Sequence, residues 1–165
     1  MSQTSPSSPV HDRRRDIDDL VRLKYRYLRC LDTKDWAGFA DCFAAEATAD
    51  YNGLTFDDPV SLVDYMRTHM GPGVVTMHQA HHPEIDVHPD DADQATGRWY
   101  LHDKVLVDEH RFALEGGAFY EDRYVRTSAG WRIARTSYRR TFELTWNLDR
   151  PGNVKVRGPE VRSRF

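Results

Sequence analysis

The sequence predicts an α+β fold in which helices come first and a curved, mostly antiparallel sheet follows. Two observations lead to this prediction. Before Met70 most apolar residues recur at the i, i+3, i+4, i+7 spacing of helices, whereas after Gly73 they alternate with a period of two, as in strands. The strand-like segments also follow one another through connections that are typical of hairpins. We therefore expect a cone-shaped sheet wrapped around the N-terminal helices, with an interior pocket.

Two helices are expected before residue 44. The first begins with Asp16 as its N-cap and runs to about Lys34, with an apolar stripe that includes Tyr27. A second, short helix repeats the same spacing from Trp36 to Phe43. These apolar faces would pack on one side of the sheet.

A hairpin and a third helix complete the first half of the chain. Residues 52–53, Asn-Gly, form a compact turn signal between the extended segments 47–51 and 54–56. Asp58-Pro59 opens the third helix, because aspartate caps helices well and proline fits the first turn. The Gly-Pro-Gly run at 71–73 ends this helix.

The second half of the chain is expected to consist of strands joined by turns. Pro83 interrupts the first stretch, because proline has no amide N–H to donate to a neighbouring strand. Residues 128–130 form a tight hairpin turn, and residues 109–117 form a longer connection. The expected strands are 74–77, 85–88, 96–107, 118–127 and 131–146.

The chain of 165 residues is expected to form one domain with an extension at each end. Residues 1–15 are rich in Ser and Pro and then basic, so they are predicted to be a flexible tail. The domain covers residues 16–146. Residues 147–165 contain prolines and glycines and are predicted to be an irregular extension.

Composition and charge exclude several classes of protein. The net charge of −3 offers no general attraction for nucleic acid, and the apolar runs are too short to span a membrane. The apolar segment of a secretory signal does not follow the basic residues near the start. Two cysteines, Cys30 and Cys42, are too few for a disulfide framework, so reduced thiols in the cytoplasm are expected.

Segment 97–107 carries a carboxylate where an apolar residue is expected. Its odd positions form the buried face, and Asp103 lies in the middle of that face. A buried carboxylate is costly unless it is paired, and such acids gather at functional sites, although a structural salt bridge is the simpler alternative. His78 is the natural partner, because a carboxylate that holds one imidazole nitrogen makes the other a better base.

Several histidines crowd the segment before this strand: His78, His81, His82 and His88. His78, His81 and His82, together with Asp103, could supply ligands to a metal ion. The segment is extended and broken by proline, however, and no recognised ligand spacing is present, so no metal is expected. Most of these histidines would then be structural.

The first helix and the last strand contribute further polar residues. Tyr27 shares the apolar face of the helix, so its hydroxyl points toward the core, where it lines the pocket or bonds to the backbone. Asp32 lies five residues later, near the end of the helix. Tyr138, Arg140 and Phe142 alternate on one face of the last strand. Arg140 would pair with Asp32, bind an anionic substrate or remain a surface cation.

Together these segments resemble the SnoaL-like branch of the nuclear-transport-factor-2-like (NTF2-like) superfamily, and most closely the bile acid 7α-dehydratases. The resemblance covers residues from about 20 to 150. At His82 and His102 the family carries other polar residues, so their roles stay open. The segments that carry the resemblance are 27–32, Met77-His78 with His81, 83–85, 95–101 with Asp103, 116–120, and Tyr138 with Arg140.

The resemblance implies a cone-shaped α+β barrel, no cofactor and a dehydration reaction in a homo-oligomer, either a trimer or a dimer. The substrate would be a steroid or a similar hydrophobic polycyclic hydroxy-enone. The family's catalytic residues fall on Tyr27, Asp32, His78, Asp103 and Arg140. The side chains expected to contact the substrate are Trp99, Tyr120, Tyr138 and His81.

In the expected mechanism His78, oriented by Asp103, removes a proton beside an enone carbonyl. Tyr27 donates a hydrogen bond to the developing enolate oxygen, and Asp32 forms a supporting pair with Arg140. Two alternatives use the same cavity. One is a ketosteroid-isomerase-like isomerase or a polyketide cyclase, and the other is a non-catalytic module that binds a hydrophobic ligand.

Overall fold

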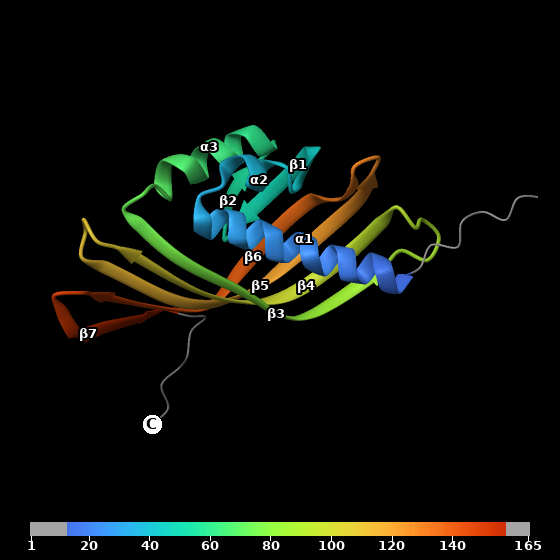
Figure 1. Cartoon of the computed structure of the whole chain (residues 1–165). Coiled ribbons are helices and arrows are strands. Elements are labelled where there is room, and N and C mark those ends of the chain that lie inside the picture. The colour runs from blue at the N-terminus through green and yellow to red at the C-terminus, as the bar shows by residue number, and fades with distance from the viewer. Residues whose placement is uncertain (1–12, 158–165) are drawn as a thin grey trace, which may run out of the picture.

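The computed structural model describes residues 13–157, so the predicted tail up to residue 12 and the segment 158–165 lie outside the described residues. Its sheet of seven strands is curled but unclosed, which confirms the α+β class (Figure 1). The strand order is β2-β1-β6-β5-β4-β3, with β7 also paired to β6. Only the β1–β6 pair in this order is parallel. The strands are β1 (Phe43–Tyr51), β2 (Leu54–Phe56), β3 (Val74–Val87), β4 (Gln94–Val107), β5 (Phe112–Thr127), β6 (Gly130–Asn147) and β7 (Arg150–Arg157).

The helices α1 (Arg13–Thr33), α2 (Trp36–Ala40) and α3 (Pro59–His69) lie on one side of this sheet. Figure 1 shows α1 running along the concave side, with α2 and α3 near its C-terminal end. The predicted apolar stripe of α1 is buried, as expected for a helix that packs on a sheet. Its buried members include Leu20, Leu23, Tyr27, Leu28 and Leu31.

The start of α1 differs from the prediction. Asp16 is not its N-cap but lies inside the helix, which begins at Arg13. The Asp16 carboxylate is buried, lies 2.7 Å from Arg126 and accepts a hydrogen bond of 3.2 Å from Nε1 of Trp131. It therefore holds the start of α1 against β5 and β6 instead of capping the helix.

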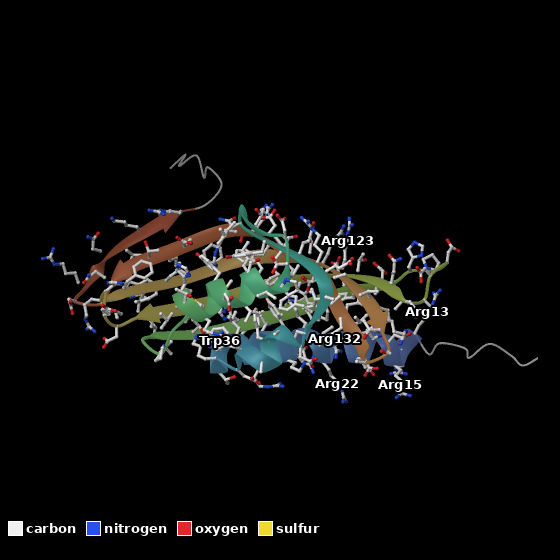
Figure 2. The ribbon with its side chains drawn as sticks, turned by 90° about the horizontal axis from the view of Figure 1, so that it is seen from above. Arg13, Arg15, Arg22, Trp36, Arg123 and Arg132 are labelled. Carbon is white, nitrogen blue, oxygen red and sulfur yellow. The ribbon has the colours of Figure 1, made fainter. Side chains whose placement is uncertain are left out.

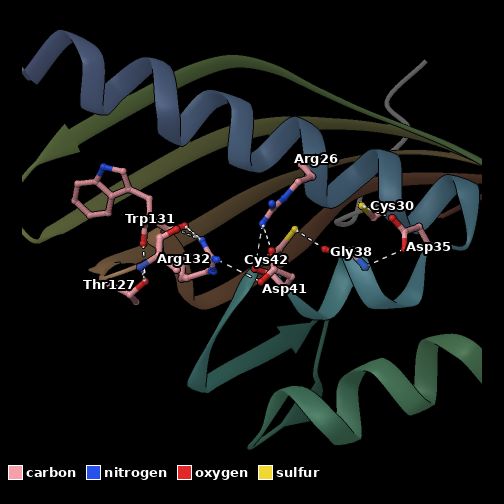
Figure 3. Close-up of polar contacts among 11 residues, drawn as sticks. Arg26, Cys30, Asp35, Gly38, Asp41, Cys42, Thr127, Trp131 and Arg132 are labelled. Carbon is pink, nitrogen blue, oxygen red and sulfur yellow. Dashed lines mark hydrogen bonds and ion pairs between the residues drawn. The ribbon is translucent and has the colours of Figure 1, made fainter.

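Aspartate caps begin the other two helices. Asp58 accepts from the backbone N–H of Ser61 at 2.8 Å, which confirms the predicted start of α3. Asp35 accepts from the backbone N–H of Gly38 at 2.9 Å at the start of α2 (Figure 3). The helix α2 is shorter than predicted, because Phe43 already belongs to β1 and pairs with β6.

β3 is one strand of 14 residues where two short strands were expected. Its register with β4 shifts between His81 and Glu84, so only His82 and Pro83 leave the ladder. β3 is the edge of the sheet, where proline is tolerated because no second neighbouring strand needs its missing N–H. His82 adopts a left-handed φ of 48° in this bulge.

Two later segments that were predicted to lack regular structure belong to strands. β5 begins at Phe112, inside the segment 109–117 that was expected to be a connection. Residues 150–157, which were expected to be irregular, form β7 instead. β7 has a partner because β6 extends beyond the part of its edge that β1 occupies.

A β-bulge in β6 changes which side chains share a face. Thr141 is an extra residue in the pairing with β5, between Arg140 and Phe142. Arg140 keeps the concave face that it shares with Tyr138, whereas the extra residue turns Phe142 into a groove on the convex side. The predicted common face of Tyr138, Arg140 and Phe142 is thus wrong for Phe142.

The basic residues that begin α1 lie far from its C-terminal end. Figure 2 shows Arg13 and Arg15 at one end of the helix layer and Trp36 of α2 near the other. A helix of 21 residues is about 30 Å long, which separates this basic end from the site described below. Within residues 13–157, no helix is long and apolar enough to cross a membrane.

Candidate active site

The last turn of α1 brings a carboxylate against a histidine of β3. Nδ1 of His78 lies 2.6 Å from Oδ1 of Asp32, and the backbone N–H of His78 donates to Oδ2 at 2.9 Å. Only 8% of the His78 side chain and 21% of the Asp32 side chain are exposed. Burial opposes the charge of Asp32, but its hydrogen bonds with His78 outweigh burial and lower the pKa of Asp32. Asp32 is therefore ionised at neutral pH.

An ionised Asp32 also determines which imidazole nitrogen carries the proton. A carboxylate can only accept hydrogen bonds, so the contacting Nδ1 of His78 must be the donor. The lone pair then resides on Nε2, which has no hydrogen-bond partner within residues 13–157. The pair thus has the arrangement of a general base held by an orienting carboxylate.

Two further side chains extend this pair. Thr76 precedes His78 by two residues on the same face of β3, and its hydroxyl donates to Oδ1 of Asp32 at 2.8 Å. Nζ of Lys34 donates to the same hydroxyl oxygen at 3.2 Å. Burial lowers the pKa of Lys34, and the charge of Asp32 opposes this shift. The four side chains form one chain of hydrogen bonds.

A groove of about 420 Å³ opens beside these residues, between α1 and the edge strand β3. A small molecule that binds in this groove would lie next to the His78 side chain. The predicted contact residue His81 is part of its lining. The lining residues are Tyr25, Leu28, Arg29, Asp32, His78, Gln79, Ala80 and His81.

The partners expected for His78 and Arg140 are exchanged. Asp103 does not orient His78 but binds Arg140 through two hydrogen bonds of 2.5 and 2.7 Å. Asp32 binds His78 and not Arg140. His78 and Asp103 do stand opposite each other in the β3–β4 register. However, the end of α1 supplies Asp32 as the partner of His78, and β6 supplies Arg140 as the partner of Asp103. The pattern of a single strand does not reveal either partner.

Arg140 reaches Asp103 because β5 has a glycine between them. A Cβ at Gly116 would overlap a terminal nitrogen of Arg140 and lie 3.2 Å from Oδ1 of Asp103. Burial opposes the charge of Arg140, but the hydrogen bonds with Asp103 outweigh it and raise the pKa of Arg140. The pair is the structural salt bridge that was the alternative reading of Asp103. Two of the five guanidinium N–H groups are thus taken by Asp103.

Tyr27 belongs to a cluster of tyrosines that leads from the core to this salt bridge. The hydroxyls of Tyr27 and Tyr51 lie 2.5 Å apart, and Tyr51 stacks on Tyr138 with ring centroids separated by 5.2 Å. The ring of Tyr138 lies 5.6 Å from the guanidinium carbon of Arg140. Burial raises the pKa values of Tyr27 and Tyr51, so both phenols stay protonated at neutral pH.

Two of the predicted substrate contacts lie in the core. Trp99 and Tyr120 are 1% and 2% exposed, and Nε1 of Trp99 donates to the hydroxyl of Tyr124 at 3.1 Å. Neither residue lines the groove beside His78. Tyr138 is half-buried near Arg140, on the concave side.

Of the other histidines in this region, His81 lines the groove, whereas His82 and His102 have partners outside it. His102 contacts Glu115 at 2.9 Å, and His82 packs edge-on against Tyr100 with ring centroids 5.6 Å apart. His81 and His82 have centroids 6.0 Å apart. In the part of the chain that the structure describes, no group of three or more His, Cys, Asp or Glu side chains could hold a metal ion.

The core also contains an ion pair that the sequence analysis missed. Nζ of Lys24 lies 2.8 Å from Oδ2 of Asp122, and neither side chain is exposed. Asp122 accepts further hydrogen bonds from the hydroxyls of Tyr124 and Thr136, at 2.8 and 2.7 Å. The ammonium group lies 3.3 Å from the ring centroid of Tyr120, which adds a cation–π contact.

The residues that were missed had signals in the sequence. Lys24 interrupts the apolar stripe of α1, and Asp122 occupies an inward position of β5, so the argument that identified Asp103 applies to both. Thr76 stands two residues before His78 and therefore shares its face of the strand. Lys34 had no such signal, because its contribution depends on how the chain turns after α1.

Comparison with known proteins identifies the family. The model of the SnoaL-like domain matches residues 12–137, and the chain therefore belongs to the SnoaL-like domain family. The narrower resemblance to bile acid 7α-dehydratases stays a prediction.

Solved structures share the fold. Rv3472 from Mycobacterium tuberculosis, a protein of unknown function, is 25% identical, with a TM-score of 0.69 over 82% of this chain and 78% of that one. A protein from Novosphingobium aromaticivorans assigned as a scytalone dehydratase is 17% identical, with a TM-score of 0.73 over 92% and 97% of the two chains. A type 2 hexachlorocyclohexane dehydrochlorinase (LinA) is also 17% identical, with a TM-score of 0.73 over 82% and 91%. The fold of this chain thus also occurs in enzymes named for elimination reactions.

Proposed function

We propose that this protein is a cofactor-independent lyase that eliminates water from a hydroxy-enone of a steroid or a similar polycyclic compound. The observation that carries the proposal is the contact between His78 and Asp32, which leaves Nε2 of the histidine as a base beside a groove. The solved structures named as a dehydratase and a dehydrochlorinase have the same fold and are named for elimination reactions, which supports the proposed class of reaction.

In the proposed reaction Nε2 of His78 takes a proton from the carbon next to the enone system. The electron pair of that C–H bond forms the enolate, and the enolate then expels the hydroxyl group as the C–O bond breaks. The imidazolium of His78 returns its proton to the departing hydroxyl, so water leaves and the histidine is neutral again. The charge of Asp32 stabilises the imidazolium between these two steps.

The enolate oxygen needs a hydrogen-bond donor, and we assign this role to Tyr27. This residue is fully buried and does not line the groove beside His78, so the role requires the substrate to reach beyond that groove to the tyrosine cluster. The raised pKa keeps this phenol protonated, and its hydroxyl already shares a hydrogen bond with Tyr51. Removing one such donor typically lowers turnover by about 100-fold to 1,000-fold. Asp103 and Arg140 would shape this side of the site as a salt bridge.

Incubation with a 7-hydroxy-3-oxo-4-ene steroid tests the proposal. The expected product is lighter by one water, and His78→Ala lowers its rate by about 100-fold to 10,000-fold. His88→Ala is the matched control, because His88 is exposed and lies outside the groove. An unchanged rate in His78→Ala, with an unchanged circular dichroism spectrum, would refute the role of His78.

The same incubation separates the alternatives. An isomerase or a polyketide cyclase would not remove water from this steroid, so the mass of the steroid would stay the same. Such an enzyme would instead change the absorption spectrum of its own substrate. A non-catalytic module would bind the steroid in calorimetry and leave it unchanged. The engaged pair of His78 and Asp32 favours catalysis, because a binding module has no need for an oriented base.

We also propose a cytoplasmic homo-oligomer, a trimer or a dimer, that uses the convex face of the sheet. Exposed apolar side chains gather on this face: Val75, Met77, Tyr100, Leu106, Phe119 and Phe142. Patches of this kind on a sheet usually mark interaction surfaces. Light scattering during gel filtration would show a multiple of 19.2 kDa, and Phe119→Arg would reduce it to a single chain.

A further inference from the structure

Lys34 ends α1 in a conformation that favours glycine. Its φ is 62°, in the left-handed region, and the next residue closes the helix end through a hydrogen bond of 2.9 Å to the carbonyl of Cys30. Glycine would adopt this backbone without strain. The turn itself therefore does not require a lysine side chain. The role of Lys34 depends instead on the contact that its ammonium group makes.

The direction of the hydrogen bonds follows from the donors that are available. An ammonium group has no lone pair, so Nζ of Lys34 can only donate to Oγ1 of Thr76 at 3.2 Å. The single hydroxyl proton of Thr76 is then directed to Oδ1 of Asp32, 2.8 Å away. The same Oδ1 accepts from Nδ1 of His78 at 2.6 Å.

We propose that Lys34 is a positioning residue of this site, which acts through Thr76 to stabilise the Asp32 carboxylate and so to hold His78 oriented as the base. The proposal rests on the proposed function for its catalytic meaning, but the chain of hydrogen bonds exists without substrate. The two hydrogen bonds link the ammonium group to Oδ1 of Asp32 through one hydroxyl, and because Nζ occupies the lone pair of that hydroxyl, its proton is left for the carboxylate.

Other charges surround the same pair and must be separated from Lys34. Arg29 and His81 line the same groove, and Asp103 stands opposite His78 on β4, where Arg140 and then Glu143 of β6 adjoin it. Asp103 and Arg140 largely neutralise each other. Among the described residues, Lys34 is the cation joined to Asp32 through a hydroxyl group, and this link is what a variant can break.

Carboxyl-carbon NMR of the full chain tests the proposal without turnover. Lys34→Met is expected to raise the pKa of Asp32 by about half a unit to one unit, because the Thr76 hydroxyl is then no longer held by the ammonium group as a donor to the carboxylate. Thr76→Val is expected to raise it as well. In the Thr76→Val background Lys34→Met should add little, because the connecting hydroxyl is already absent.

Two further variants serve as controls. Lys104→Met removes an exposed lysine that pairs with Glu115, and it should leave the titration of Asp32 unchanged. Lys34→Arg keeps the charge and should restore most of the wild-type behaviour. Equal titration of Asp32 in wild type and Lys34→Met would overturn the proposal. An undiminished effect of Lys34→Met in the Thr76→Val background would also overturn it, because Lys34 would then act only through space.

Activity supplies a second readout that keeps the two proposals apart. If the chain is a dehydratase, the acid limb of its pH–rate profile should move to higher pH in Lys34→Met by about half a unit, since the base is then protonated more easily. An Asp32 titration that shifts as expected in a protein without dehydratase activity would refute the proposed function and leave the role of Lys34 intact.

Discussion

Replacing Asp122 by asparagine would leave the ammonium group of Lys24 without its counter-ion in the core between α1 and the sheet. Both side chains are fully buried and their charged atoms are 2.8 Å apart. The asparagine oxygen could still accept from Tyr124 or Thr136, so the substitution mainly removes the charge. Breaking one side of a buried pair typically costs about 3–5 kcal/mol, whereas an exposed pair contributes about 0–1 kcal/mol.

The upper limit of this cost follows from the lysine itself. With Asp122 gone, Lys24 can shed its proton in the folded state, and burial already lowers its pKa below the usual value. Neutralising an ordinary lysine at pH 7 costs about 5 kcal/mol, so the loss of stability cannot greatly exceed this value. For a chain of this size the melting temperature would fall by roughly 6–20 °C.

The sign of the pH dependence follows from proton linkage. In the variant the unfolded chain keeps the lysine proton and the folded chain does not, so stability rises with pH. The penalty of Asp122→Asn should therefore shrink by up to about 1.4 kcal/mol for each pH unit between pH 7 and 9.

Urea unfolding at pH 7 and 9, followed by circular dichroism, measures both effects. Asp64→Asn is the control, because Asp64 forms an exposed pair with Arg67, and it should cost less than about 1 kcal/mol. Lys24→Met combined with Asp122→Asn should recover most of the lost stability, since no unpaired charge remains. A cost no larger than that of the control, or a double variant no more stable than Asp122→Asn, would refute the reasoning.

Three further predictions concern the site. Gly116→Ala should displace the guanidinium of Arg140 and cost about 1–3 kcal/mol in urea unfolding, whereas Gly73→Ala, which has open space for its Cβ, should cost less than about 1 kcal/mol. The pKa of Asp32 is lower in the folded chain than in the unfolded chain. Its contribution to the free energy of unfolding is therefore complete above the usual carboxyl pKa and is lost as the pH falls toward the pKa of the folded chain. The Asp32→Asn variant should accordingly show a weaker dependence of stability on pH below about pH 4, measured by urea unfolding. Tyr27→Phe should lower steroid turnover by about 100-fold to 1,000-fold in steady-state kinetics, and an unchanged kcat would remove the phenol from the proposed mechanism.

The sequence by itself determined which faces are buried and where helices and strands succeed one another. The stripe of α1, the cap at Asp58 and the burial of Asp103 were all predicted from local patterns. These features depend on the spacing of side chains along one helix or strand, and that spacing is fixed by backbone geometry. The same reasoning applied to Lys24 and Asp122 would have placed both charged side chains in the core, although not as partners of each other.

Only the tertiary structure decided which polar groups meet. Asp32 binds His78 because α1 ends over β3, and Arg140 binds Asp103 because the missing side chain of Gly116 lets its guanidinium cross β5. Such choices depend on where one element lies over another, to within the 2.5–3.2 Å of these hydrogen bonds. A periodic pattern specifies a face but not a partner on a different element, and for that reason the candidate site residues could be named from the sequence while their pairing could not.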